Sequence, residues 1–272
     1  MEKAKISKID DFTYCFTEDA MGVEVYMYLL VGDEKVLLID TAYGFTDVPE
    51  AIKNITELPL IVANTHAHLD HVHGNHMYPE VFFSKKDEAL FRLHTDYDYC
   101  KKLYMQIAQQ NGMSDEQIFS EKMKLEKAAR ACLSRYRNFP PEMYFELGNR
   151  KVFIIETPGH TEGSVCFLDK RTGWLFSGDT GCRDGVLLNL EGSTTVQTFY
   201  QTICGLQTLV AAGEISMLYP AHQVKPLETD ILDYYARGCE DILKGEISEE
   251  ELTKGLYVYN KTAIAFQKEK IR

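Results

Sequence analysis

Residues 65–71, T-H-A-H-L-D-H, are the most informative segment of the chain, and they follow directly on a short apolar run that predicts a β-strand. It gathers three imidazoles and one carboxylate within a few positions. His66 and His68 are two residues apart, so in an extended or tightly turned backbone they can point the same way and share one metal ion. Asp70 and His71 are offset from that pair and suit a neighbouring ion. Imidazole and carboxylate ligands together suit zinc, iron or manganese.

Three further ligand candidates lie downstream, each just after a predicted strand. They are His160 in T-P-G-H, Asp179 in S-G-D and His222 in P-A-H. Taken singly each is a weak signal, because a lone histidine is more often a core or surface residue and an aspartate before a helix is usually a cap. Their shared position at strand ends strengthens them, because open α/β sheets carry their sites there. The sequence therefore predicts a two-metal site built from five histidines and two aspartates.

The apolar pattern predicts a β-rich scaffold around these motifs, interrupted by helices. In the first half we expect strands at residues 12–17, 23–31, 36–40 and 60–63 and a helix at 46–58. In the second half we expect strands at 151–156, 164–168, 174–176 and 215–219, a helix at 194–212 and a hairpin at 256–266. Residues 85–148 instead predict helices, one over 87–110 and one that opens at a capping box of Ser114 and Gln117 and runs to about residue 137. We interpret this block as a helical insertion that caps the site.

The composition is that of a globular protein with an acidic surface. The 272 residues are 45% hydrophobic and 26% charged, enough for a sizeable core. The formal net charge of −12 would repel a phosphate backbone, so nucleic acid is not an expected partner. No apolar segment of a signal peptide or membrane span occurs, which predicts a cytoplasmic protein without membrane attachment. The seven cysteines are odd in number and never form C-x-x-C, so neither a disulfide framework nor a zinc knuckle is expected.

The order H-x-H-x-D-H, followed by a distant histidine, aspartate and histidine, resembles the motif set of the metallo-β-lactamase superfamily over about residues 10–85 and 148–225. The resemblance implies an α/β fold, a four-layer αββα metallo-β-lactamase sandwich. We expect a single domain over residues 1–272 with the helical insertion at about 85–148. The implied cofactors are two divalent metal ions, zinc in preference to iron or manganese.

The resemblance also assigns a role to each of the seven ligand candidates. His66, His68 and His160 would hold the first ion, Asp70, His71 and His222 the second, and Asp179 would bridge both. Asp40, in L-L-I-D-T, matches an early aspartate of the family that supports the site and binds no metal. Asp70 would in addition be the catalytic residue, holding the water or taking part in proton transfer.

The residues around the ligands are expected to support the site or to have no role in binding metal. Side chains that could orient the imidazoles are Thr65, Thr161 and Ser177. The remaining histidines are expected to line the edge of the site, to face solvent or to sit in the insertion; they are His73, His76 and His94.

The sequence differs from individual branches of the family at several positions, and these differences exclude some of the family's activities. True β-lactamases of this fold usually lack a liganding histidine at the position of His71, often have cysteine at that of Asp179 and carry export signals, so antibiotic hydrolysis is not expected. The glyoxalase II-like and lactonase-like branches are more similar. Even there, Cys182 stands where acyl-homoserine lactonases have a tyrosine, and the basic residues with which glyoxalase II holds glutathione are not recognisable.

The sequence thus predicts a dinuclear metal-dependent hydrolase whose metal-bridging hydroxide attacks a small ester, thioester or lactone. Three alternatives stay open: a phosphodiesterase, a non-haem iron oxidoreductase and a non-catalytic metal-dependent binding protein. A basic stripe beside the site would favour the phosphodiesterase. A dioxygenase would keep only the ligands of the first ion. The expected partner is a small-molecule substrate. A homodimer is also open, because the insertion could form a dimer contact instead of a lid.

Overall fold

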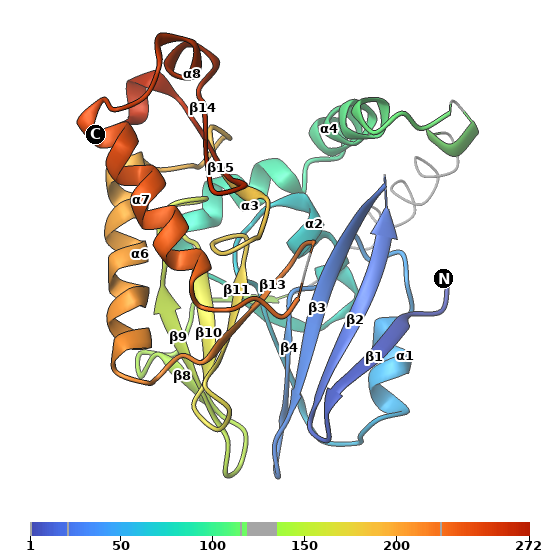
Figure 1. The fold of residues 1–272 in the computed structure, drawn as a ribbon. Helices are drawn as coiled ribbons and strands as arrows, with labels where there is room; N and C mark the ends of the chain where they lie inside the picture. Colours follow the sequence, from blue (N-terminus) through green and yellow to red (C-terminus); the bar gives the residue numbers. More distant parts are fainter. Residues whose placement is uncertain (1, 21, 115, 119–134, 224) are drawn as a thin grey trace. The chain divides into compact units, whose positions relative to one another are not determined.

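The computed structural model describes residues 2–20, 22–114, 116–118, 135–223 and 225–272. Internal contacts divide the chain into two compact units (Figure 1). Unit 1 comprises Met1–Phe139 and Glu146–Asn149, and unit 2 comprises Pro140–Phe145 and Arg150–Arg272. Each unit combines β-sheet with helices, so the predicted mixed α/β class is confirmed. The single domain over residues 1–272 stays a prediction.

Unit 1 is built on a seven-stranded sheet whose strands follow chain order. The strands are β1 (Lys5–Asp10), β2 (Thr13–Ala20), β3 (Val23–Val31), β4 (Val36–Ile39), β5 (Leu60–Ala63), β6 (Glu80–Phe82) and β7 (Arg135–Arg137). The strands from β1 to β4 pair antiparallel, and those from β4 to β7 pair parallel. The carboxyl ends of β4, β5, β6 and β7 therefore meet at one edge of the sheet, and residues 64–71 leave β5 at that edge.

The helices of unit 1 lie between these strands. They are α1 (Val48–Lys53), α2 (Leu69–Val72), η1 (His73–Met77), η2 (Lys85–Asp87), α3 (Glu88–His94) and α4 (Tyr97–Gln110). Apolar residues of α1 and α4 pack with the strands in one buried core. Tyr104 of α4 is fully inside it, with edge contacts to Tyr43 and Phe45. This tyrosine therefore serves the core of unit 1.

The helical insertion differs from its prediction in three places, and in the last of them Tyr144–Glu146 form a strand instead of continuing the helical block to residue 148. The helix expected over 87–110 is broken into α3 and α4, because the Asp96 side chain caps α4 by accepting a hydrogen bond from the Tyr99 N–H at 2.9 Å. The second predicted helix does not reach residue 137, because β7 pairs with β6 instead and so covers a strand edge. The capping box of Ser114 and Gln117 is present, and the predicted helix over 119–134 lies outside the described residues.

Unit 2 is built on a five-stranded and a three-stranded sheet. The larger has the order β13-β11-β10-β9-β8, with β8 (Tyr144–Glu146), β9 (Lys151–Glu156), β10 (Val165–Asp169), β11 (Trp174–Gly178) and β13 (Met217–Pro220). The smaller has the order β12-β15-β14, with β12 (Gly185–Leu188), β14 (Leu256–Tyr259) and β15 (Thr262–Phe266). The predicted C-terminal hairpin is confirmed, and it pairs with β12.

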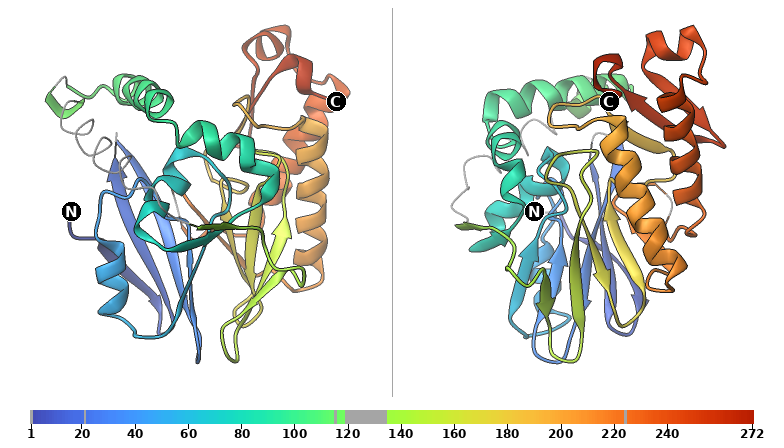
Figure 2. Two further views of the ribbon diagram at one scale, coloured as in Figure 1. Left: turned by 180° about the vertical axis from the view of Figure 1, so that it is seen from behind. Right: turned by 90° about the vertical axis from the view of Figure 1, so that its left-hand side faces the viewer.

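Two long helices of unit 2, α6 (Val196–Ala211) and α7 (Ile231–Lys244), pack side by side (Figure 2), followed by α8 (Glu249–Lys254) and η3 (Lys268–Lys270). The turn before His160 packs on α6, since a Cβ atom on Gly159 would lie 2.4 Å from the Phe199 ring. Only glycine fits there. None of the helices in the described ranges is long and apolar enough to cross a bilayer.

Strand direction explains why the ligand motifs of unit 2 gather. β10 is antiparallel to both β9 and β11, and β13 is parallel to β11. The strands β9, β11 and β13 therefore run the same way, and their carboxyl ends meet at one edge of the sheet. As predicted, each ligand motif begins where one of these apolar strands ends.

Candidate metal centre

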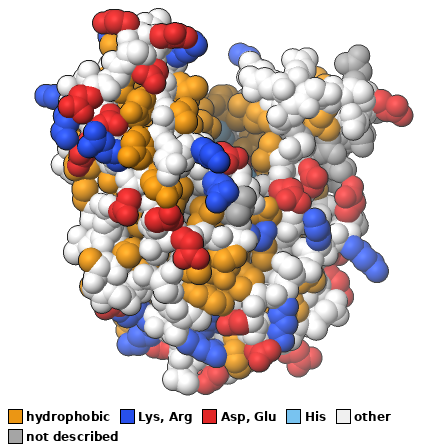
Figure 3. All heavy atoms as spheres, in the orientation of Figure 1, with side chains coloured by type: hydrophobic (Ala, Val, Ile, Leu, Met, Phe, Trp, Pro, Cys, Tyr) orange, Lys and Arg blue, Asp and Glu red, His pale blue; other side chains and the backbone are white. Residues whose placement is uncertain are grey.

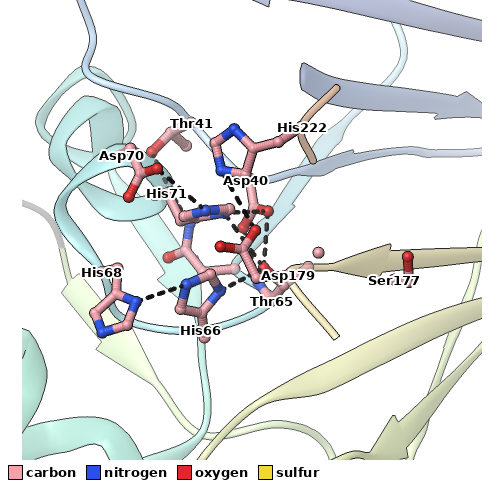
Figure 4. A network of polar contacts seen from close by, with 12 residues as sticks. Asp40, Thr41, Thr65, His66, His68, Asp70, His71, Ser177, Asp179 and His222 are labelled. Carbon is pink, nitrogen blue, oxygen red and sulfur yellow. Dashed lines mark hydrogen bonds and ion pairs between the residues drawn. The ribbon is translucent and has the colours of Figure 1, made fainter. Parts of the chain in front are cut away.

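Unit 1 carries four of the predicted ligands on the loop and short helix that follow β5 (Figure 4). The Nε2 atom of His66 lies 3.1 Å from Nδ1 of His68. Two nitrogens bound to one tetrahedral zinc ion at the usual bond length lie about 3.3 Å apart, so this spacing fits a shared ion. The Nε2 atom of His71 lies 3.6 Å from Oδ2 of Asp70. The loop thus supplies two ligand pairs, in the pairing that the sequence predicted.

Asp40 anchors this loop through hydrogen bonds. Its buried carboxylate accepts hydrogen bonds from the Thr65 N–H and hydroxyl, both at 2.8 Å, and from Nδ1 of His71 at 2.9 Å. Because Nδ1 donates, the lone pair of His71 resides on Nε2, the atom that faces Asp70. The Thr65 oxygen also lies 3.1 Å from Nδ1 of His66, which leaves the lone pair of that ring on Nε2 as well. The supporting roles predicted for Asp40 and Thr65 are confirmed.

Two side chains of the helical insertion hold the backbone on either side of His68. Asp87 accepts a hydrogen bond from the Ala67 N–H at 3.1 Å, and Nδ1 of His94 accepts one from the Leu69 N–H at 3.0 Å. The His94 ring also lies against the His68 ring, with centroids 4.9 Å apart. The sequence analysis did not single out Asp87, and it placed His94 in the insertion without this supporting role. No local signal reveals them, because their partners are backbone amides 20 and 25 residues away.

His73 follows the metal loop and is buried, although the edge of the site or solvent was expected for it. Its Nδ1 donates a hydrogen bond to the Tyr43 carbonyl at 3.1 Å. Burial disfavours the charged imidazolium and lowers the pKa of His73 to about 4. The backbone segment of Tyr43 is held in turn by the buried Glu18 carboxylate, which accepts the Tyr43 N–H at 2.8 Å. A neutral histidine therefore fastens the end of the metal loop to the segment after β4.

Unit 2 carries the other three predicted ligands, each near the end of its strand. Asp179 follows β11 directly, and His160 and His222 come shortly after β9 and β13. One Asp179 oxygen, Oδ2, lies 3.4 Å from Nε2 of His160, and the other, Oδ1, lies 3.3 Å from Nε2 of His222. The two oxygens of one carboxylate thus face two different histidines. This is the geometry that a carboxylate needs to bridge two ions.

Backbone carbonyls and one tyrosine support these ligands. Nδ1 of His160 donates to the Leu187 carbonyl of β12 at 2.8 Å, which places the lone pair on Nε2. The hydroxyl of Tyr235, on α7, donates to the Cys182 carbonyl at 2.6 Å, in the loop that begins at Asp179. The Cys182 thiol contacts the Gly178 carbonyl, so this residue is part of the packed loop. Tyr235 was also missed by the sequence, since it lies 53 residues from its partner.

The other two residues expected to orient imidazoles have different surroundings. The Thr161 hydroxyl lies 2.8 Å from Oγ of Ser164, in the turn that carries His160. The Ser177 hydroxyl is buried and has no hydrogen-bond partner among the residues that the structure describes. Their roles toward the ligands stay predictions.

The donor set fits metal ions. All seven predicted ligands belong to groups of side chains that could hold an ion: His66, His68, Asp70 and His71 in unit 1, and His160, Asp179 and His222 in unit 2. In each unit the ligand atoms are nitrogen lone pairs and carboxylate oxygens, and the opposite nitrogen of three rings is hydrogen-bonded to a second group. Metal-binding histidines are usually held this way.

The comparison with known families agrees with this chemistry. The family model described as the metallo-beta-lactamase superfamily matches residues 21–222. The chain belongs to the metallo-beta-lactamase superfamily. As a member of that superfamily it is a metal-dependent hydrolase, and the predicted family, fold class and enzyme class are confirmed.

Individual relatives of the superfamily are distant. The acyl-coenzyme A thioesterase MBLAC2 of Gallus gallus is 25% identical over 215 residues, which cover 74% of this chain and 73% of that protein. A probable metallo-hydrolase of Streptococcus pyogenes is 25% identical over 204 residues, covering 72% of this chain and 77% of its own length. The solved structure of a metallo-beta-lactamase family protein from Thermus thermophilus matches with a TM-score of 0.59 and 18% identity, over 88% of this chain and 82% of that one. That similarity shows the fold alone.

Proposed function

We propose that this chain is a dinuclear zinc hydrolase that cleaves a small acyl thioester. The observation that carries the two-ion proposal is the placement of the Asp179 oxygens, one facing His160 and the other facing His222. A carboxylate that served a single ion would not need histidines at both oxygens. The thioester is favoured over the ester and lactone of the sequence prediction because related proteins are named acyl-coenzyme A thioesterases.

The ligand pairs within each unit support the full assignment. His66 with His68 form one pair and Asp70 with His71 the other. We assign the first ion to His66, His68 and His160, the second to Asp70, His71 and His222, and both to Asp179. Zinc suits this mixture of imidazole and carboxylate ligands.

Two such ions, when bound, supply a hydroxide nucleophile near neutral pH and polarise the carbonyl under attack. The residues of the chain hold this chemistry in place. Asp40, Thr65 and the Leu187 carbonyl keep the opposite ring nitrogens protonated, so that three imidazoles present neutral lone pairs. Asp70 is partly exposed, and in the proposed reaction its carboxylate receives a proton of the attacking water. As the water oxygen bonds to the acyl carbon, the C–S bond breaks, and Asp70 passes the proton it received to the leaving sulfur. The products are a thiol and a carboxylic acid, which loses its proton to solvent.

The surface gives no particular support to the phosphodiesterase alternative. On the face shown in Figure 3, Lys and Arg side chains are interspersed with Asp and Glu. The thioesterase and hydrolase relatives imply a small-molecule substrate. Four further points are also proposals. They are the identity of the metal as zinc, a homodimer, a cytoplasmic location and a role of the insertion as a cap.

The test combines metal analysis with a substrate panel. Protein purified without added metal is expected to contain two zinc ions per chain and to hydrolyse an acyl-coenzyme A ester in preference to a lactone or a phosphodiester. Activity should vanish with a chelator and return with zinc. It should also rise with pH through a near-neutral apparent pKa, about 7, because the nucleophile is the deprotonated form of water. Turnover by the metal-free protein, or phosphodiester cleavage alone, would contradict the proposal.

A further inference from the structure

A second feature of unit 1 is a pocket of about 410 Å³ beside the helical insertion. Three aromatic, three cationic and two other polar residues line it: Phe83, Phe91, Tyr136, Lys85, Arg92, Arg137, Glu88 and Asn138. All of them lie within unit 1. None is among the seven ligands assigned above, so this pocket is distinct from the proposed metal ligands.

The floor of the pocket is a packed aromatic cluster. Phe91 lies 5.1 Å from Phe83 and 4.4 Å from Tyr136, measured between ring centroids. The two phenylalanines are nearly buried, whereas Tyr136 is half-buried and can present a ring face and a hydroxyl. Such a surface suits a planar heteroaromatic ring, because stacking on aromatic side chains is favourable for any base.

The rim of the pocket is positive although the whole chain is acidic. Three cations and one carboxylate line it, and with Glu80, which pairs with Arg137, the local charge is still positive, while the chain as a whole has a net charge of −12. Arg92 pairs with Glu88 at 2.7 Å, and Arg137 pairs with Glu80 at 2.6 Å. Both pairs are solvent-exposed, so they contribute little and leave further guanidinium N–H groups for an anion. A phosphate-bearing ligand matches this rim.

The residues that line the pocket lie near the edge of the sheet that carries the metal loop. β5, β6 and β7 run parallel and the metal loop follows β5, while the lining residues lie on β7, just after β6 and β7, and on α3. Neighbouring strands are about 4.8 Å apart, so a residue two strands away is about 10 Å from the loop. Ala67 and Val72 of the metal loop and α2 pack in the same cluster as Phe83 and Phe91. The metal ligands of unit 1 and the pocket thus share one piece of structure.

We propose that this pocket binds the adenine nucleotide end of an acyl-coenzyme A substrate. Coenzyme A carries a planar purine and phosphates at one end and the thioester at the other, separated by the flexible pantetheine arm. The aromatic floor receives the purine, Lys85 and Arg92 bind phosphate, and the arm leads along the sheet edge to the metal loop. This inference rests on the proposed thioesterase function. It goes further by naming the part of the substrate, the nucleotide, that the enzyme would recognise.

A binding experiment tests the pocket independently of catalysis. Calorimetric titration of the metal-loaded protein with adenosine 3′,5′-bisphosphate, the nucleotide end of coenzyme A, is expected to show binding that Lys85→Gln and Arg92→Gln each weaken about tenfold or more, the effect of losing one charge-assisted hydrogen bond. Glu88→Gln is expected to strengthen binding, because it removes the carboxylate from the rim. The matched control is Lys244→Gln, which breaks a similarly exposed i,i+4 ion pair in unit 2 and should change nothing.

A kinetic experiment connects the pocket to the reaction. We compare an acyl-coenzyme A ester with the same acyl group on N-acetylcysteamine, which has the thioester but no nucleotide. In Lys85→Gln and Arg92→Gln the ratio of kcat/KM for the long to the short substrate should fall about tenfold, and in Lys244→Gln it should stay as in the parent. An unchanged ratio in the pocket variants, with no binding of the bisphosphate, overturns the pocket assignment. Failure of the parent to cleave either thioester instead overturns the proposed function, and the inference with it.

Discussion

The two units supply their metal ligands in contrasting ways. Unit 1 places four ligands within residues 66–71, on one loop and the first turn of α2. Unit 2 spreads three ligands from residue 160 to residue 222, on three separate strand ends. The supports differ as well. In unit 1 the loop is held by side chains, Asp40, Asp87 and His94, whereas in unit 2 backbone carbonyls and a distant tyrosine do this work.

This difference indicates where the ligand group of each unit is sensitive to substitution. A crowded loop can be disturbed by changing one supporting side chain, because the loop has no strand register to hold it. Ligands at the ends of parallel strands are placed by the hydrogen-bonded sheet itself, so single supporting groups should matter less there. Substitutions in the two units test whether this difference holds.

The largest effect is expected from Asp179, the ligand of unit 2 whose oxygens face two histidines. Asp179→Ala should lose both ions and reduce hydrolysis by more than about 100-fold, the upper range for loss of a merely orienting partner. His68→Ala, in unit 1, should chiefly deplete the first ion. Metal content per chain after dialysis measures both. If Asp179→Ala retains two ions as tightly as the parent, the bridging role is wrong.

The next largest effect is a loss of folding stability at low pH, and it arises from His73 of unit 1. The pKa of buried His73 is about 4, whereas an unfolded histidine titrates near 6.5. Between these pH values the unfolded state binds more protons than the folded state, so acidification favours unfolding. The contribution of His73 to the free energy of unfolding is therefore present above pH 6.5 and is lost as pH falls toward 4. The total loss is about 3 kcal/mol. Denaturant unfolding of the parent and of His73→Gln, at several pH values, isolates this contribution. The parent should lose more stability on acidification; parallel curves would exclude the effect.

A smaller effect is expected from the supports of the metal loop. Asp87→Ala and His94→Leu remove the acceptors for the Ala67 and Leu69 amides and should weaken metal affinity about 10- to 100-fold. The matched variants Asp87→Asn and His94→Asn keep an oxygen acceptor and should retain most of the affinity. Zinc titration against a competing chelator measures all four. Equal losses in both members of a pair would show that the hydrogen bond is not what holds the loop.

The smallest effect is expected from Tyr235, the tyrosine that supports the Asp179 loop of unit 2. Tyr235→Phe removes a buried hydrogen bond to the Cys182 carbonyl and should cost about 1–2 kcal/mol in denaturant unfolding. The control is the neighbouring Tyr234→Phe, whose hydroxyl makes an exposed contact with Asp230 and which should change stability by less than about 0.5 kcal/mol. Metal content should be unchanged in both. A loss of zinc from Tyr235→Phe would mean that unit 2 depends on single supports as much as unit 1.

Much of the chemistry could be read from local sequence. The ligands in residues 66–71 are a short-range motif, and the strands that precede every ligand are marked by apolar runs bounded by turn residues. The C-terminal hairpin was also predictable, because alternating residues flank a turn at Asn260 and Lys261, and both residues take up left-handed conformations in the structure. Five strands were not predicted, since their charged or short sequences become strands only by pairing with neighbours; they are β1, β6, β7, β8 and β12.

The ligand types, their spacing and the family follow from the sequence alone. The folded structure was needed to show which nitrogen presents its lone pair in His66, His71 and His160, because that depends on Thr65, Asp40 and Leu187, which lie from 1 to 31 residues away. It likewise decided that Asp87 and His94 hold the metal loop and that aromatic and basic residues of the insertion line one pocket. Metal ligands are recognisable by residue type, whereas supporting groups and pockets are defined by contacts, and contacts between distant residues leave no pattern in a single sequence.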